Sequence, residues 1–249
     1  MDWQGEGYIL SVRKHGETSA IIEVLTRDMG RHAGLVRGGI GRKLRPVLQP
    51  GNKVQLEWRA RLSEHLGSFS VEALTSRAAE IMDDRMALSA LNAACAIARE
   101  TLPEREAHPL VYDAFKILLN NMENPEIWPA LFVQWEAGLL RAMGYGLDLS
   151  SCAATGVNDN LTHVSPRSGR AVSASAAEPY LDKLYPLPSF MIGQPFVTPV
   201  DVYNGLSLTG YFLETRVQWG VNKTLPEARA QMIARLIEEG HARVPDKSL

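Results

Sequence analysis

Cysteine is nearly absent from this chain of 249 residues, which contains only Cys95 and Cys152. Two thiols cannot form a disulfide framework, and they are too few for a four-cysteine zinc site. Such scarcity is typical of a protein kept in a reducing cytosol. We therefore expect the fold to depend on a hydrophobic core, for which the 45% hydrophobic content is sufficient.

Long hydrophobic runs are also missing. No stretch approaches the roughly eighteen apolar residues that a transmembrane helix needs. The first residues, MDWQGE, lack the basic and apolar regions of a signal peptide. These absences predict a cytoplasmic protein without membrane contact.

The local motifs that mark many enzymes are absent as well. The sequence has no glycine-rich phosphate loop ending in Lys-Ser/Thr, no histidine pair around a glutamate at helical spacing, and no serine elbow between glycines. Its six histidines are scattered singly. We expect no catalytic residue, metal or cofactor, although an active site assembled from distant residues is an alternative that the sequence leaves open.

Charge is distributed unevenly along the chain. The formal net charge is −2, but residues 1–77 carry 12 Lys and Arg against 8 Asp and Glu, whereas the remainder carries 14 against 20. A positive N-terminal part favours an anionic partner there.

The N-terminal part has the pattern of short strands. Residues 53–61 alternate polar and apolar, which places Val54, Leu56 and Trp58 on one face. Weaker candidates are residues 8–13, 20–26, 31–37 and 68–74, separated by glycine-containing turns. Five short strands predict a small closed barrel of the OB type, which often binds oligonucleotides. Trp58 lies on the apolar face of its strand and is expected in the core. For Tyr8 and Phe69 the sequence leaves open whether they belong to the core or stack on bases.

Beyond residue 77 the composition favours helices. We expect a helix over residues 79–102, ended by Pro103, and others over 128–143, 199–219 and 226–239. A further apolar stripe predicts buried positions at Leu110, Phe115, Leu118 and Leu119. The predicted class is α+β: an OB-like barrel domain (residues 1–77), then an all-helical domain (78–249) with an irregular insertion at 150–179.

The strongest functional cluster lies between two predicted strands, at residues 37–45. This segment contains three glycines and four cations: Arg37, Arg42, Lys43 and Arg45. Guanidinium groups pair phosphate oxygens, and glycines would let a mobile loop follow an irregular DNA strand. The alternative is a solvated hairpin tip that only keeps the protein soluble.

Other cations extend this cluster to a basic track around the predicted barrel. They are Lys53, Arg59 and Arg61 on one strand, Arg13 and Lys14 at the end of the first strand, and Arg27 and Arg31 around a turn. The three on one strand occupy alternate positions and should project together, although Glu57 interrupts the row. With few aromatic residues for stacking, we expect little sequence preference and strongly salt-dependent binding of single-stranded nucleic acid.

An ordered set of short motifs runs through most of the chain. In the N-terminal part they are Gly7-Tyr8-Ile9-Leu10, Gly16-Glu17-Thr18-Ser19, Leu25-Thr26, Gly30-Arg31 and Val36-Arg37-Gly38-Gly39. Later ones are WEAGLLRAMGYGLDL at residues 135–149, Cys152, Thr155-Gly156, Ser165-Pro166 and Ser168-Gly169. In this order they resemble the RecO family of bacterial recombination mediators.

The resemblance implies a nucleoid-associated protein that binds single- and double-stranded DNA and anneals complementary strands. It also implies cooperation with RecR in loading RecA onto DNA coated by single-strand-binding protein. We expect the helical domain to bind the acidic, hydrophobic tail of that protein, with Arg141 as a candidate contact. Another OB-type module, binding RNA or associated with translation, is the alternative.

Many members of the family carry zinc on two C-x2-C pairs. The matching positions here are Cys152, Thr155, Ser173 and Ala176. One thiolate and two hydroxyl groups do not make a structural zinc site, even with His163 nearby. The resemblance therefore implies a metal-free remnant of a zinc finger.

Overall fold

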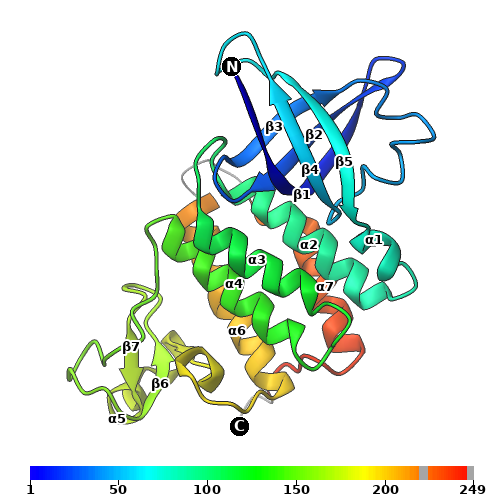
Figure 1. Ribbon diagram of the computed structural model, residues 1–249. Helices are drawn as coiled ribbons and strands as arrows, with labels where there is room; N and C mark the ends of the chain where they lie inside the picture. Colours follow the sequence, from blue (N-terminus) through cyan, green and yellow to red (C-terminus); the bar gives the residue numbers. More distant parts are fainter. Residues whose placement is uncertain (219–223, 246–249) are drawn as a thin grey trace. The chain divides into compact units, whose positions relative to one another are not determined.

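The computed structural model describes residues 1–218 and 224–245 (Figure 1). The chain divides into two compact units, Met1–Glu123 and Asn124–Leu249. Each unit contains a β-sheet and helices, so the protein belongs to the mixed α+β class.

The first unit begins with five strands that close into a barrel. They are β1 (Asp2–His15), β2 (Ser19–Thr26), β3 (Gly30–Val36), β4 (Lys53–Arg59) and β5 (Ser68–Thr75). Their order is β1-β2-β3-β5-β4, and β4 pairs back onto β1. All five predicted strands are confirmed. β1 is longer than expected because its first half pairs with β4 and its second half with β2.

Several aromatic side chains pack against one another inside the barrel. Trp58 is 2% exposed, which confirms its predicted place in the core. Trp3 stacks on Trp58 with a centroid distance of 6.2 Å and meets Phe69 edge-on at 5.7 Å. Tyr8 is buried too, against Tyr112 at 5.5 Å. Phe69 and Tyr8 are therefore packing residues and are not available to stack on bases.

β3 and β5 meet only briefly. Their parallel pairing is limited to Leu35 and Ser68. After Val36 the chain turns away, with Gly38 at φ +67°, a conformation that favours glycine, and the Gly39 amide bonded to the Val36 carbonyl at 3.3 Å. β5 is thus paired with β4 along its length but with β3 only at its first residue.

The connection from β3 to β4 is an ordered series of turns. The Leu44 and Arg45 amides both bond to the Gly41 carbonyl, at 3.1 and 2.9 Å. Ile40, Leu44, Val47 and Leu48 pack against the barrel core. The segment predicted as a mobile loop, residues 37–45, therefore contains hydrogen-bonded turns, and its apolar side chains pack on the barrel.

Three helices complete the first unit: α1 (Arg77–Glu80), α2 (Arg85–Thr101) and α3 (Pro109–Asn120). The expected single helix over 79–102 is divided, because Asp84 caps a new helix by accepting hydrogen bonds from the Met86 and Ala87 amides, both at 2.9 Å. α2 packs on β1. In α3 the predicted apolar stripe is buried, except for Leu110, which is 80% exposed.

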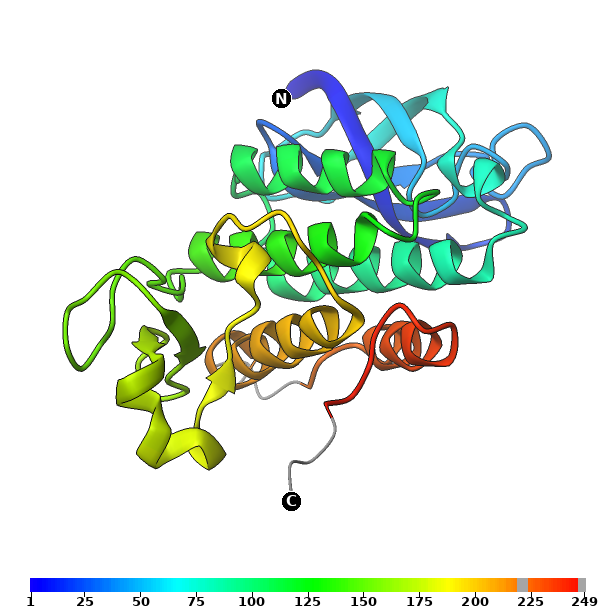
Figure 2. The ribbon, with the colours of Figure 1, turned by 90° about the horizontal axis from the view of Figure 1, so that it is seen from below.

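The second unit contains α4 (Trp128–Ala142), α6 (Pro199–Phe212), its π-helical continuation η3 (Leu213–Gln218) and α7 (Glu227–Glu238). α4 and α6 run side by side (Figure 2). The predicted helices match these elements, apart from Trp219, which lies outside the described residues. Within the described ranges, no helix is long and apolar enough to cross a membrane.

A small sheet interrupts the helices of the second unit. Its strands are β6 (Leu161–Val164), β7 (Ala171–Ser173) and β8 (Tyr185–Pro186), in the order β7-β6-β8. The short helix α5 (Ala174–Ala177) and the 3-10 helices η1 (Glu178–Lys183) and η2 (Ser189–Ile192) surround it (Figure 1). The predictions of an all-helical domain and an irregular insertion are therefore wrong. Strands of two to four residues are too short to show an alternating pattern.

A buried ion pair links three helices of the second unit. Arg229 of α7 donates hydrogen bonds to both carboxylate oxygens of Glu136 in α4, at 2.6 and 2.9 Å. Thr209 of α6 donates to the same carboxylate at 2.5 Å. The Glu136 and Arg229 side chains are 0% and 7% exposed, so both charges depend on these partners.

Candidate nucleic-acid interface

Four exposed cations lie on the turns between β3 and β4: Arg37, Arg42, Lys43 and Arg45. Among the residues that the structure describes, none of them forms an ion pair. Residues 37–45, the basic segment, are also tied to the β1–β2 hairpin, because the Ile40 amide bonds to the Thr18 carbonyl at 3.2 Å. The basic segment thus presents free positive charge from a fixed backbone.

A groove of about 510 Å³ joins this segment to β1. Val12, Ile40 and Leu48 form its apolar part, while Lys14 and Arg45 both line it. Arg13 is exposed on the adjacent position of β1 and is also without an ion pair among the described residues. The structure therefore brings Lys14 and Arg45 together, as a binding surface for an anion requires.

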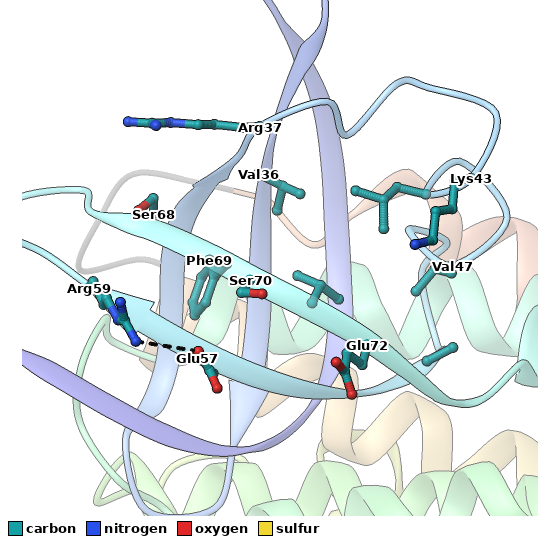
Figure 3. A pocket seen from close by; sticks show the side chains of 13 residues that line it. Val36, Arg37, Lys43, Val47, Glu57, Arg59, Ser68, Phe69, Ser70 and Glu72 are labelled. Atoms are coloured by element: carbon teal, nitrogen blue, oxygen red, sulfur yellow. Dashed lines mark ion pairs between the residues drawn. The ribbon is translucent and has the colours of Figure 1, made fainter.

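A larger groove, of about 950 Å³, lies on the other side of the segment, along β5 (Figure 3). Arg37, Lys43 and Arg59 contribute positive charge to its lining, and Glu57 and Glu72 contribute carboxylates. Arg59 lies 3.7 Å from Glu57. This groove, called the seam groove below, is mixed in charge.

Arg27, in contrast, is neutralised by a helix of the same unit. Its guanidinium donates two hydrogen bonds to the Asp113 carboxylate, at 3.1 and 3.0 Å, and lies 3.7 Å from Asp28. These hydrogen bonds hold the pKa of Asp113 below its ordinary value, so the carboxylate is charged at neutral pH. Arg27 is therefore poorly placed to serve a phosphate.

Arg31 and Lys53 are also engaged by the protein itself. Arg31 pairs with Glu23 and donates to the Leu102 carbonyl at 2.8 Å. Lys53 pairs with Glu6. The basic track expected around the barrel is thus interrupted at Arg27, Arg31 and Lys53, because carboxylates of the same unit pair with these cations.

Lys53 and Arg59 lie on the outward face of β4, as expected, but they do not form a continuous row with Arg61. Lys53 and Arg59 occupy opposite ends of β4, roughly 20 Å apart at the usual rise per residue. Arg61 lies beyond the end of the strand. The alternating pattern predicted correctly that Lys53 and Arg59 face outward, but the length of β4 keeps their charges far apart.

Arg105 is a structural residue that the sequence gave no reason to select. It has a left-handed backbone conformation, φ 63°, and its amide bonds to the Arg31 carbonyl at 2.7 Å. Its guanidinium donates to the carbonyl groups of Ser63 and His65 in the β4–β5 connection. Arg105 therefore fixes the loop that carries Arg61, and no local motif marks this role.

His32 lies inside the barrel, and neither of its ring nitrogens has a hydrogen-bond partner among the residues that the structure describes. It is 4% exposed and meets the Trp58 and Trp3 rings edge-on, at 4.8 and 5.2 Å. Burial, with the nearby charge of Arg105, lowers the pKa of His32 to about 4. The ring is therefore neutral at physiological pH, and it serves as part of the core.

Three of the four positions that match zinc ligands, Cys152, Thr155 and Ser173, lie together in the second unit. Cys152 is buried, and its Sγ accepts hydrogen bonds from the Ser173 amide at 3.2 Å and the Ser173 hydroxyl at 3.4 Å. Burial would raise the pKa of Cys152, but hydrogen bonds from Ser173 and Thr155 lower it to about 6. Within the described ranges, no cluster of three or more His, Cys, Asp and Glu residues could hold a metal ion. Ser173 and Thr155 thus hydrogen-bond to the Cys152 sulfur.

Arg141 lies near the C-terminal end of α4 and is exposed. It lines a groove of about 260 Å³ with Leu147, Leu149 and Met191. An apolar floor beside a cation is a suitable surface for a peptide that is both acidic and hydrophobic.

The structure as a whole thus defines a class of protein: a small closed barrel with a basic segment at one end, followed by helices and a second, smaller sheet. Two family models match this chain, "Recombination protein O N terminal" at residues 1–77 and "Recombination protein O C terminal" at residues 82–225. The chain belongs to the recombination protein O (RecO) family.

Curated relatives match nearly the whole chain. A protein named DNA repair protein RecO from Caulobacter vibrioides (strain NA1000 / CB15N) is 49% identical over 239 residues, covering 96% of this chain and 98% of the relative. Proteins with the same name from Dinoroseobacter shibae and Phenylobacterium zucineum are 50% and 49% identical, covering 94% and 96% of this chain and 97% and 99% of their own lengths. Full-length similarity makes the family assignment independent of any single motif.

Proposed function

We propose that this protein acts in DNA repair and homologous recombination by binding single- and double-stranded DNA at the basic end of its barrel. One observation carries the proposal: the basic segment holds four exposed cations that lack carboxylate partners among the described residues, and Lys14 shares a groove with Arg45. Unpaired guanidinium and ammonium groups bind phosphates without first breaking an ion pair.

Family membership supports a mediator role without covalent chemistry. In this proposal the protein anneals complementary strands and, with RecR, helps to load RecA at the nucleoid onto DNA coated by single-strand-binding protein. The barrel is of the OB type, and residues 1–77 form the DNA-binding domain. Residues 78–249 form the partner-binding domain, in which residues 150–179 are the metal-free remnant of a zinc finger.

The groove beside Arg141 is the proposed site for the tail of single-strand-binding protein. Leu147, Leu149 and Met191 would contact apolar side chains of that tail, and Arg141 an acidic one. We expect a C-terminal peptide of single-strand-binding protein to bind the full chain and to lose most of its affinity when Arg141 is replaced by alanine. Equal binding by the variant would remove this groove from the proposal.

The DNA-binding proposal is tested by replacing Arg42, Lys43 and Arg45 together with alanine. Affinity for a fluorescent oligothymidylate is then measured across a salt series. Each lost phosphate contact should reduce the slope of log affinity against log salt by about 0.7 for a single strand. We expect the slope to fall by about two in total, with an unchanged melting temperature because all three side chains are exposed.

Two results would contradict this proposal. An unchanged slope would show that the basic segment does not contact the strand. Much tighter binding of a structured RNA than of oligothymidylate at the same salt concentration would favour an RNA-binding module instead.

A further inference from the structure

From Ser70 to Thr75, one edge of β5 has no neighbouring strand in the part of the chain that the structure describes. β5 pairs with β4 from Ser68 to Thr75, but β3 leaves its other side after the single pair between Leu35 and Ser68. Along an edge strand, alternate backbone N–H and C=O groups point outward without partners. From Ser70 to Thr75 this open edge is about 20 Å long.

The seam groove follows this open edge (Figure 3). Its lining includes Phe69 and Val71 from the face of β5 that points toward the core, and Ser70 and Glu72 from the opposite face. A cavity bounded by both faces of one strand lies at the edge of that strand. The groove therefore includes the space that β3 would fill if it did not turn away at Gly38, and it extends across β5 to Glu57 and Arg59 of β4.

We propose that the seam groove binds an extended, acidic peptide segment of a partner protein by strand addition to β5. The added segment would pair its backbone with the open edge and complete the sheet where β3 is missing. Its inward side chains would meet Val36, Leu44 and Val47, which form an apolar wall opposite β5. This binding needs no DNA and goes beyond the proposed function.

The charges around the groove favour a peptide over a nucleic acid strand. Glu72 of β5 and Glu57 of the neighbouring strand β4 both line the groove, so a chain of phosphates in it would meet two carboxylates. A peptide backbone is neutral, and acidic side chains are needed only where Arg37 and Lys43 lie. Neither cation has an ion-pair partner among the described residues, whereas Glu57 already has Arg59 at 3.7 Å.

The test uses the full chain with the peptide Asp-Val-Thr-Val-Thr-Asp fused ahead of Met1 through a flexible linker of about ten Gly and Ser residues. The Met1 amino group donates to the Ala60 carbonyl at 2.7 Å, next to Arg59 at the groove, so the linker can reach. Tethering gives an effective concentration in the millimolar range, which suits a weak interaction. The readout is amide hydrogen exchange at residues 70–75.

We expect the amides that face the groove to exchange at least about fivefold more slowly than in a matched fusion carrying Asp-Pro-Thr-Pro-Thr-Asp, because proline lacks the N–H needed for pairing. Replacing Arg37 and Lys43 together with glutamate should abolish this protection. A peptide with lysine in place of both aspartates should restore it in the charge-reversed protein. Both side chains are exposed, so the variant should keep its melting temperature.

Several outcomes would overturn the proposal. Equal exchange in the two fusions would show that no strand is added. Protection that survives the charge reversal would remove Arg37 and Lys43 from recognition. Finally, if free oligothymidylate alone slowed the same amides as much as the tethered peptide does, the groove would be a path for DNA.

Discussion

The buried Arg229 of the second unit and the unpaired basic groups of the barrel differ in how their charge is met, although Arg27, Arg31 and Lys53 of the first unit are paired as Arg229 is. In the second unit Arg229 is buried and its charge is met by Glu136, with Thr209 bonded to the same carboxylate. In the barrel, buried His32 has no hydrogen-bond partner, and the exposed cations of the basic segment have no carboxylates among the described residues. A basic group that is paired with a carboxylate of the protein contributes to the stability of the fold. A basic group without such a partner can instead take up a proton, as His32 can, or bind an anion from outside, as the exposed cations can.

The largest effect should follow from breaking the compensated pair. Replacing Arg229 with alanine leaves the Glu136 carboxylate buried without its counter-charge. Removing one partner of a buried ion pair typically costs about 3–5 kcal/mol. We expect a loss of this size in the free energy of unfolding, measured by urea denaturation followed by circular dichroism.

The matched control replaces both charges by apolar side chains, Glu136→Leu with Arg229→Met. This double variant should be clearly more stable than the single Arg229→Ala variant, because no uncompensated charge remains. If the two variants were equally unstable, lost packing rather than an unpaired charge would explain the effect. The ion pair would then not distinguish Arg229 from the unpaired basic groups of the barrel.

The second effect concerns pH and the uncompensated histidine. The pKa of His32 is lowered to about 4 in the folded barrel, against about 6.5 in an unfolded chain. The unfolded state therefore takes up the proton first, and stability falls as the pH drops from about 6.5 to about 4. The difference corresponds to roughly 3 kcal/mol, measured as urea stability over this range.

The variant His32→Leu removes the titrating group from the barrel interior. Its stability should depend less on pH between 4 and 6.5 than that of the unchanged protein. A profile as steep as the original would assign the pH dependence to other groups.

A third, smaller effect on DNA affinity should distinguish two exposed arginines of the barrel. Arg45 is free of ion pairs among the described residues, whereas Arg27 is held by Asp113. We expect Arg45→Ala to weaken oligothymidylate binding several-fold and to reduce the salt slope by about 0.7. Arg27→Ala should leave both quantities unchanged. Equal losses in the two variants would mean that pairing inside the protein does not decide which cations bind DNA.

The smallest effect on DNA binding should come from removing the carboxylate partner of Arg27. The variant Asp113→Asn removes the carboxylate and turns a compensated cation into a free one. The melting temperature should hardly change, since exposed ion pairs contribute little to stability. The salt slope should become slightly steeper if Arg27 then reaches a phosphate, and a flatter slope would contradict this reasoning.

Local sequence patterns were sufficient to predict much of the fold but less of the candidate nucleic-acid interface. Alternation and turns located all five barrel strands and the buried Trp58. The pairing of Arg27 with Asp113 was not predictable, because the two residues are separated by 86 positions and only tertiary structure brings them together. The small second sheet was missed because strands of two to four residues are too short to show a detectable alternation.

The packing of the basic segment against the barrel was missed for a different reason. Its glycines and charges are typical of a mobile loop, and only the contacts of Ile40 and Leu44 with the barrel core show that it is anchored. Apolar residues spaced among cations in a turn have no regular period, so periodicity alone cannot identify them.

The bond between the Ile40 amide and the Thr18 carbonyl has a thermodynamic consequence. It holds the hairpin next to Lys14 and the segment that carries Arg45 in one arrangement before any ligand arrives. Binding here should therefore avoid the entropy cost of ordering a loop. Calorimetry should accordingly give a small heat-capacity change, unlike the large negative change of a segment that folds as it binds.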